Sequence, residues 1–195
     1  MGIMEEMTVV KATDMKFLIA KDFDHVRNNC RKITDSCTVR FQENGESRLL
    51  AKYVKGVLKT SDFKASLEES SNAVNHKPGT YCRKHDWISA SIYEDVLREA
   101  NELNEFVIQK HEEFSYFYNE PIHMHQDSNE YKLNSLFVLK DEAVTGLLIF
   151  PFFNLYYEME EGDLLIFNES EYHYVTRNYP ISLERYRYAV NFHLM

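Results

Sequence analysis

The chain has 195 residues, of which 44% are hydrophobic and 27% are charged, a composition typical of a globular domain and not of a disordered or fibrous protein. Its 31 acidic and 22 basic residues give a net charge of -9, which argues against non-specific binding to nucleic acid. The apolar stretch 146–157 is too short for a membrane span, and Glu5 and Glu6 stand where a secretory signal would be apolar. We therefore expect one domain over residues 1–195, located in the cytoplasm or the nucleus, with no membrane partner.

The first 60 residues are predicted to be mostly strand. Apolar and polar residues alternate over 38–41 and 48–54, and Asn44-Gly45 between them favours the positive φ angles of a tight hairpin turn. A short helix over 61–72 and a loop over 75–79 follow. Five basic residues in this part of the chain form either a solvated sheet face or a basic rim for an anionic substrate: Arg48, Lys52, Lys55, Lys59 and Lys64.

A long helix is predicted over 91–114. Ser91 and Glu94 match a capping box, in which each side chain accepts a hydrogen bond from an amide of the first turn. Five apolar residues then recur at helical spacing and give one apolar stripe: Ile92, Val96, Ala100, Leu103 and Val107. Because the other faces are charged, we expect this helix to support a sheet and not to carry a site.

After Pro121 the pattern changes to short strands separated by turn residues. The predicted strands cover 133–139, 147–150, 155–157, 163–167, 172–176 and 183–194. Short strands at this even spacing favour a sandwich or a barrel. The predicted fold class is therefore α+β, with N-terminal strands and support helices over 1–118 and a compact β core over 119–195.

Three residues of this β core match a metal site. In His125-Gln126-Asp127, residues two apart point the same way along an extended chain, so His125 and Asp127 can hold one ion together. His173 lies on another predicted strand, 48 residues further on. Two histidines and one carboxylate form a facial triad, which leaves three positions of an octahedral ion open and is typical of non-haem Fe(II) oxygenases. His123 shares the face of His125, and we interpret it as a core or supporting residue.

The last predicted strand carries two arginines on one face. Strand alternation puts Arg185 and Arg187 on the same side as Ala189 and Asn191. An arginine inside a barrel needs an anionic partner, and a guanidinium group binds a carboxylate through two parallel hydrogen bonds. A dicarboxylate cosubstrate would provide that partner, and so would one of the acidic residues of the chain.

The order of these motifs, His-x-Asp followed by a distant His and then an Arg, resembles the Fe(II)/2-oxoglutarate-dependent dioxygenase superfamily. The segments 146–151 and 162–168 also resemble strands that precede the distal histidine in that superfamily. This resemblance covers about residues 121–195 and implies a double-stranded β-helix (jelly-roll) fold. It implies that His125, Asp127 and His173 hold Fe(II) and that Arg187 binds 2-oxoglutarate. The reaction would use O2, hydroxylate a C–H bond and release succinate and CO2.

One feature departs from the superfamily. Its members commonly have Arg-x-Ser on the last strand, whereas this chain has Arg187-Tyr188-Ala189 and lacks the hydroxyl group. Arg185 is therefore an alternative anchor for the cosubstrate, although Arg187 fits the register of the strand better.

The sequence does not determine the substrate. The strand sequences around 150–151 and 167–168 are most similar to those of the TET/JBP group, which hydroxylates methylated bases in nucleic acid. This resemblance favours a methylated or thymine nucleobase as the substrate. A small metabolite and a protein side chain are the alternatives. The net charge argues against a self-sufficient binder of duplex DNA. A non-catalytic jelly-roll binding module and a zinc site with the same ligands are the rival interpretations of the whole pattern.

Overall fold

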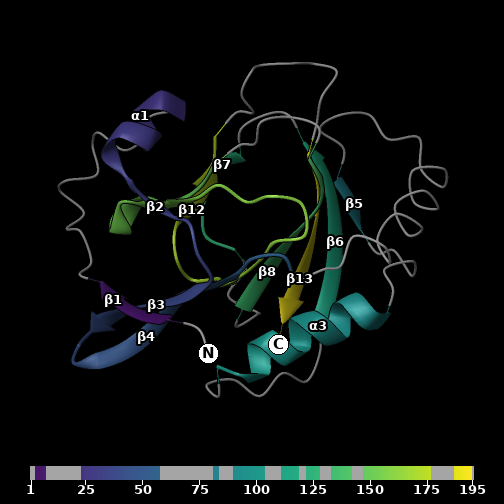
Figure 1. Cartoon of the computed structure of the whole chain (residues 1–195), viewed down its shortest axis with the longest axis horizontal. Helices are drawn as coiled ribbons and strands as arrows, with labels where there is room; N and C mark the ends of the chain where they lie inside the picture. Colours follow the sequence, from purple (N-terminus) through teal and green to yellow (C-terminus); the bar gives the residue numbers. More distant parts are fainter. Residues whose placement is uncertain are drawn as a thin grey trace.

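The computed structural model describes residues 3–7, 23–57, 81–83, 90–103, 111–118, 122–127, 133–141, 147–176 and 187–194. These residues form two β-sheets with helices around them (Figure 1). Within these ranges, no helix is long and apolar enough to cross a membrane.

The larger sheet has eight strands. In their order across the sheet these are β1 (Ile3–Met7), β3 (Cys37–Glu43), β4 (Glu46–Val54), β11 (Leu164–Asn168), β8 (Leu133–Asp141), β13 (Arg187–Leu194), β6 (His111–Tyr118) and β5 (Tyr81–Arg83). Neighbouring strands are antiparallel except for the parallel pair β1 and β3 at one edge.

The smaller sheet has five strands. Their order is β2 (Arg31–Ile33), β10 (Leu155–Tyr157), β9 (Leu148–Phe150), β12 (His173–Val175) and β7 (Ile122–His125). The pair β2 and β10 is parallel, and the other neighbours are antiparallel. The 3-10 turn η2 (Pro151–Phe153) connects β9 to β10.

From β6 onward the chain passes repeatedly from one sheet to the other. The strands β6, β8, β11 and β13 belong to the larger sheet, and β7, β9, β10 and β12 belong to the smaller one. This alternation is the winding of a double-stranded β-helix, and it brings together strands that are far apart in the sequence. The predicted α+β class with a jelly-roll core is confirmed.

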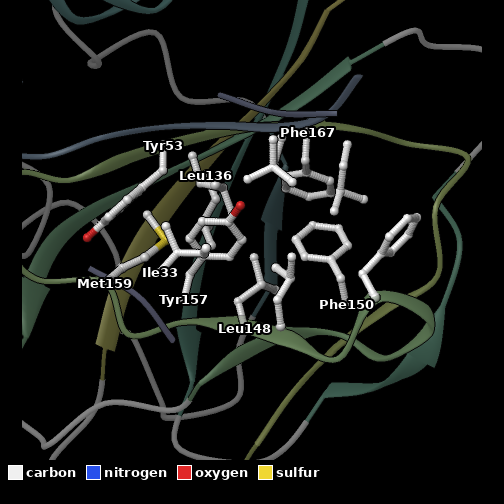
Figure 2. Close-up of a cluster of buried hydrophobic side chains, with 14 of the residues drawn as sticks. Ile33, Tyr53, Leu136, Leu148, Phe150, Tyr157, Met159 and Phe167 are labelled. Carbon is white, nitrogen blue, oxygen red and sulfur yellow. The ribbon is translucent and has the colours of Figure 1, made fainter. Parts of the chain in front are cut away.

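The hydrophobic core lies between the two sheets (Figure 2). Tyr53, Leu136 and Phe167 enter it from the larger sheet, and Phe150 and Tyr157 enter from the smaller one. The ring of Phe150 meets the rings of Tyr157 and Phe167 edge to face, at centroid distances of 5.9 and 5.7 Å. Such contacts add to the free energy gained by burying apolar area, so the core holds both sheets at a fixed separation.

The predicted hairpin is present at the start of this core. Strands β3 and β4 are joined at Asn44 and Gly45, whose φ angles are 52° and 84°. Both angles are positive, as the turn requires, and asparagine and glycine tolerate them best. The hairpin strands extend beyond the predicted segments 38–41 and 48–54 by only a few residues.

The support helix packs on the larger sheet as predicted, but it is shorter. Helix α3 (Ala90–Asn101) buries Val96 and Ala100 completely and lies across the end of the sheet that contains β13 (Figure 1). The prediction of a helix as far as residue 114 is wrong, because His111–Tyr118 forms β6 and pairs along its whole length with β13. The pairing with a strand about eighty residues away overrides the local helical spacing.

A short helix and several basic residues also differ from the sequence prediction. Helix α1 (Phe23–Asn29) falls in the region predicted as mostly strand, and its Val26 packs against an apolar cluster of the smaller sheet. Lys52 is buried and paired with Glu99 and Glu102, so it belongs to no exposed basic rim. The predicted helix over 61–72, the loop over 75–79, Lys59 and Lys64 lie outside the described residues.

Candidate metal centre

Strand pairing assembles the three residues of the predicted triad. His125 is the last residue of β7, and Asp127 follows two residues later. His173 is the first residue of β12, which pairs antiparallel with β7 and places His173 directly opposite His125. The backbone hydrogen bonds of the smaller sheet therefore determine how close the two imidazoles lie.

The three side chains converge on one point. The Nε2 atom of His125 lies 3.4 Å from Oδ1 of Asp127, and Nε2 of His173 lies 3.6 Å from Oδ2 of the same carboxylate. One ligand atom from each residue can be chosen so that all lie within 4.8 Å of one another. Ligands at right angles around an ion, with bonds of about 2.1 Å, would lie about 3 Å apart. The arrangement therefore fits a single ion with small movements of the side chains.

His173 is held in one orientation by its surroundings. Its side chain is only 5% exposed and its ring meets the ring of Phe167 edge to face at a centroid distance of 4.8 Å. Its Nδ1 lies 2.9 Å from the carbonyl oxygen of Glu171. A hydrogen bond to a carbonyl requires a proton on Nδ1, so Nε2, which faces Asp127, carries the lone pair whenever the imidazole is neutral. This is the usual way in which a metal-binding histidine is oriented.

Asp127 is fixed by contacts with two other parts of the chain. Its backbone N–H donates to the carbonyl oxygen of Glu169 at 3.2 Å, and the neighbouring Gln126 side chain donates to the carbonyl oxygen of Ser170. The amide of Asn134 on β8 donates to Oδ2 of Asp127 at 2.7 Å. The turn between β11 and β12 and the strand β8 therefore both determine where this carboxylate lies.

The electrostatic surroundings keep Asp127 ionised. Burial by itself would raise the pKa of this carboxyl group, but the hydrogen bond with His125, the charge of His173 and the hydrogen bond from Asn134 together lower the pKa below its ordinary value. The group is therefore a carboxylate near neutral pH and does not need to lose a proton in order to bind a cation.

The site is enclosed on one side and accessible on the other. The side chain of His125 is 39% exposed, whereas that of His173 is almost fully buried. Tyr172, which directly precedes His173, is also exposed, and its ring lies 5.4 Å from that of Phe152. The candidate site is therefore open to solvent on the side of His125.

The two predicted cosubstrate arginines are only partly described. Arg187 is the first residue of β13, and its backbone pairs with Tyr118 of β6 and Asp141 of β8. The side chains of Arg187 and His123, and the whole of Arg185, lie outside the described residues. The roles assigned to them from the sequence stay predictions.

Sequence reasoning missed Asn134. It is 2% exposed and occupies β8 between the buried residues Leu133 and Leu136. A buried side-chain amide needs hydrogen-bond partners, so a polar residue in an apolar strand was the available signal. A separate cavity of about 300 Å³ lies between β3, β4 and α3 and is lined by residues that include Lys52 and Glu99, none of them part of the triad.

Neither the family models nor the curated proteins give a match to this sequence. Among solved structures, the chain is similar to the viral collagen prolyl hydroxylase of Paramecium bursaria Chlorella virus-1 in its 2OG complex, with a TM-score of 0.56 and 11% identity over 74% of this chain and 94% of that one. For a prolyl-4-hydroxylase of Pseudomonas putida the TM-score is 0.57 and the identity 15%, over 74% of this chain and 91% of that one. For NgTET1 in complex with 5mC DNA the TM-score is 0.53 and the identity 14%, over 95% of this chain and 90% of that one.

At these identities the likeness shows the fold. The chain has the double-stranded β-helix fold of the 2OG-Fe(II) oxygenases, among which are both prolyl hydroxylases and a TET protein. The resemblance to this superfamily, predicted from the order of the motifs, is thereby confirmed at the level of the fold.

Proposed function

We propose that the protein is an Fe(II)/2-oxoglutarate-dependent dioxygenase that hydroxylates a C–H bond of its substrate. The observation that carries the proposal is the convergence of His125, Asp127 and His173 on one point, in a fold shared with 2OG-Fe(II) oxygenases. A two-histidine, one-carboxylate donor set suits Fe(II) and leaves coordination positions for a cosubstrate and O2.

Each side chain has a defined part in this proposal. His125, Asp127 and His173 would hold Fe(II), and Arg187 would bind the distal carboxylate of 2-oxoglutarate. When bound, iron, 2-oxoglutarate and O2 supply the oxidation, with release of succinate and CO2 as the substrate is hydroxylated. Phe150 and Phe167 line the enclosed side of His173, where they exclude water from its imidazole ring.

The test is succinate formation from 2-oxoglutarate by protein purified without oxygen and then supplied with Fe(II), ascorbate, O2 and a cell extract as substrate. Asp127→Ala should abolish succinate formation and weaken binding of Fe(II), because it removes the charged ligand. Glu161→Ala removes an exposed carboxylate away from the triad and serves as the matched control. Unchanged succinate formation by Asp127→Ala would contradict the ligand assignment.

The rival functions give different results in the same preparation. A zinc site would hold Zn(II) after purification without oxygen and would form no succinate. A non-catalytic jelly-roll module would bind Fe(II) and 2-oxoglutarate and also form no succinate. Metal analysis together with the succinate assay therefore separates all three.

For the substrate we propose a methylated or thymine nucleobase. In support of it, the likeness to NgTET1 in complex with 5mC DNA extends over 95% of this chain, compared with 74% for the two prolyl hydroxylases. The exposed Tyr172 next to His173 offers a ring on which a base can stack. A small metabolite and a protein side chain are the alternatives, and the prolyl hydroxylase neighbours favour the latter.

Mass spectrometry distinguishes these substrates. The protein would be incubated separately with oligonucleotides that contain 5-methylcytosine or thymine, with proline-containing peptides and with a metabolite extract. A gain of one oxygen on a base supports the nucleobase proposal. A gain only on peptides or metabolites contradicts it and leaves the dioxygenase proposal in place.

A further inference from the structure

Asn134 links the candidate metal ligand Asp127 to the opposite sheet. It lies on β8 of the larger sheet, in register with Phe167 of β11, whereas Asp127 follows β7 of the smaller sheet. The hydrogen bond of 2.7 Å from Nδ2 of Asn134 to Oδ2 of Asp127 therefore bridges the two sheets. Since Asn134 is 2% exposed, water competes little for this bond.

This contact makes the two oxygens of Asp127 unequal. Each oxygen faces one imidazole, with Oδ1 3.4 Å from Nε2 of His125 and Oδ2 3.6 Å from Nε2 of His173, but only Oδ2 also receives the amide hydrogen of Asn134. A carboxylate binds a metal ion through one oxygen or through both, and the second mode occupies an additional coordination position. A hydrogen-bond donor held on one oxygen disfavours binding of the ion through both oxygens.

We propose that Asn134 is a positioning residue that keeps Asp127 a ligand through one oxygen, Oδ1. The inference rests on the proposed function of the triad and deepens it, because binding through one oxygen preserves the positions that a cosubstrate and O2 require. The amide acts only through Asp127 and does not contact the ion. Partners of this kind around a metal site typically affect the affinity for the metal by 10–100-fold.

A purely structural role gives a different expectation. Asn134 would then serve only to satisfy buried polar groups between the sheets, and its loss would lower the free energy of unfolding without changing the metal site. The two roles are separated by measuring metal affinity and metal spectrum in variants that remain folded.

The variants are Asn134→Leu, which keeps most of the volume without a donor, and Asn134→Ala, which removes the side chain. The probe is Co(II), added to protein without other metal, and its visible absorption reports the number and geometry of the ligands. We expect Co(II) to bind about 10-fold or more weakly, with a shifted absorption spectrum. Ser135→Ala, a buried polar deletion at the next position of the same strand, should keep wild-type affinity and spectrum.

A measurement on the wild-type chain covers the case in which both variants fail to fold. On addition of Zn(II), the side-chain amide signals of Asn134 in a ¹⁵N NMR spectrum should shift and one proton should stay protected from exchange. Unchanged amide signals would overturn the proposal, as would wild-type affinity and spectrum for Co(II) in a folded Asn134 variant. By contrast, Co(II) binding that is unaffected by Asp127→Ala would contradict the triad itself, so the two failures are distinguishable.

Discussion

At the scale of single residues, hydrogen bonds orient two of the three residues of the candidate site, His173 and Asp127. The carbonyl of Glu171 holds Nδ1 of His173, and Asn134 holds Oδ2 of Asp127. Such partners fix the orientation of a ligand before the ion arrives, which lowers the entropic cost of binding. The donor set is therefore already organised in the polypeptide.

The first prediction at this scale concerns the cosubstrate. Arg187→Ala should raise the 2-oxoglutarate concentration needed for half-maximal succinate formation by roughly two orders of magnitude, because truncating one partner of a buried charge pair costs about 2–5 kcal/mol. The affinity for Fe(II) should stay unchanged. Arg185→Ala is the matched control and should have a small effect. The reverse result would mean that the anchor lies two residues earlier on the strand.

The sequence predicted which residues can bind a metal better than it predicted which residues contact them in space. His125, Asp127 and His173 could be chosen because few side chains bind metals and their spacing along extended segments is informative. Asn134 could be noticed as a polar residue in an apolar strand, but its partner could not be predicted, because the partner depends on which residue of the opposite sheet it meets. That contact exists only after the two sheets pack together.

At the scale of elements, local patterns identified most strands but misplaced one boundary. The segments 155–157 and 163–167 match β10 and β11 closely, since apolar runs bounded by turn residues require no distant information. The predicted helix over 91–114 ran into β6, because the partner that makes His111–Tyr118 a strand is β13 at the other end of the β core. Helix α1 was missed because its seven residues are too few to show helical periodicity in the sequence.

Helix α3 contacts the larger sheet through the buried cation Lys52 as well as through its buried apolar residues. The Nζ atom of Lys52 on β4 lies 2.8 Å from carboxylate oxygens of both Glu99 and Glu102 and 2.9 Å from the carbonyl oxygen of Glu99. Lys52→Met should lower the free energy of unfolding by about 3 kcal/mol, because it leaves the partly buried Glu99 with only the exposed Arg98, 3.6 Å away, as a cationic neighbour.

Urea denaturation measures this change. Lys55→Met is the control, since Lys55 is 41% exposed and 4.0 Å from Glu160, and it should change the free energy of unfolding by less than about 1 kcal/mol. Equal effects of the two substitutions would show that the buried ion pair does not hold the helix.

A second ion-pair cluster predicts a dependence of stability on pH. Burial acts to raise the pKa of Glu158, but Lys32 and Arg27 lower it below the ordinary value of 4.5. A carboxyl group whose pKa is lowered by folding contributes stability above its unfolded pKa, and this contribution is lost as the pH falls through the folded pKa. Glu158→Gln should therefore destabilise the protein at neutral pH and have progressively less effect below about pH 4. An equal loss of stability at neutral pH and below about pH 4 would show that the charge of Glu158 does not cause the destabilisation.

At the scale of the whole molecule, the core and the candidate site share the aromatic residues Phe150 and Phe167. The ring of Phe150 contacts Tyr157 and Phe167 in the core, and its centroid lies 6.1 Å from that of His173. Phe150→Ala should lower the free energy of unfolding by about 3–5 kcal/mol, as expected for loss of a fully buried aromatic ring. It should also weaken Co(II) binding, since His173 loses part of its support. Normal Co(II) affinity in the destabilised variant would show that the core and the site are independent.

The winding of the chain between the two sheets also affects how fast the candidate site can form during folding. Tyr53 and Asp163, which share a hydrogen bond of 2.6 Å, are 110 residues apart, and β7 pairs with β12 although other strands lie between them in the sequence. Chains dominated by such distant pairings fold in milliseconds to seconds, slower than helical bundles, because the loops must close before the contacts repay the lost entropy. The imidazole pair depends on such a distant pairing, so we expect uptake of Co(II) during refolding to report formation of the native topology.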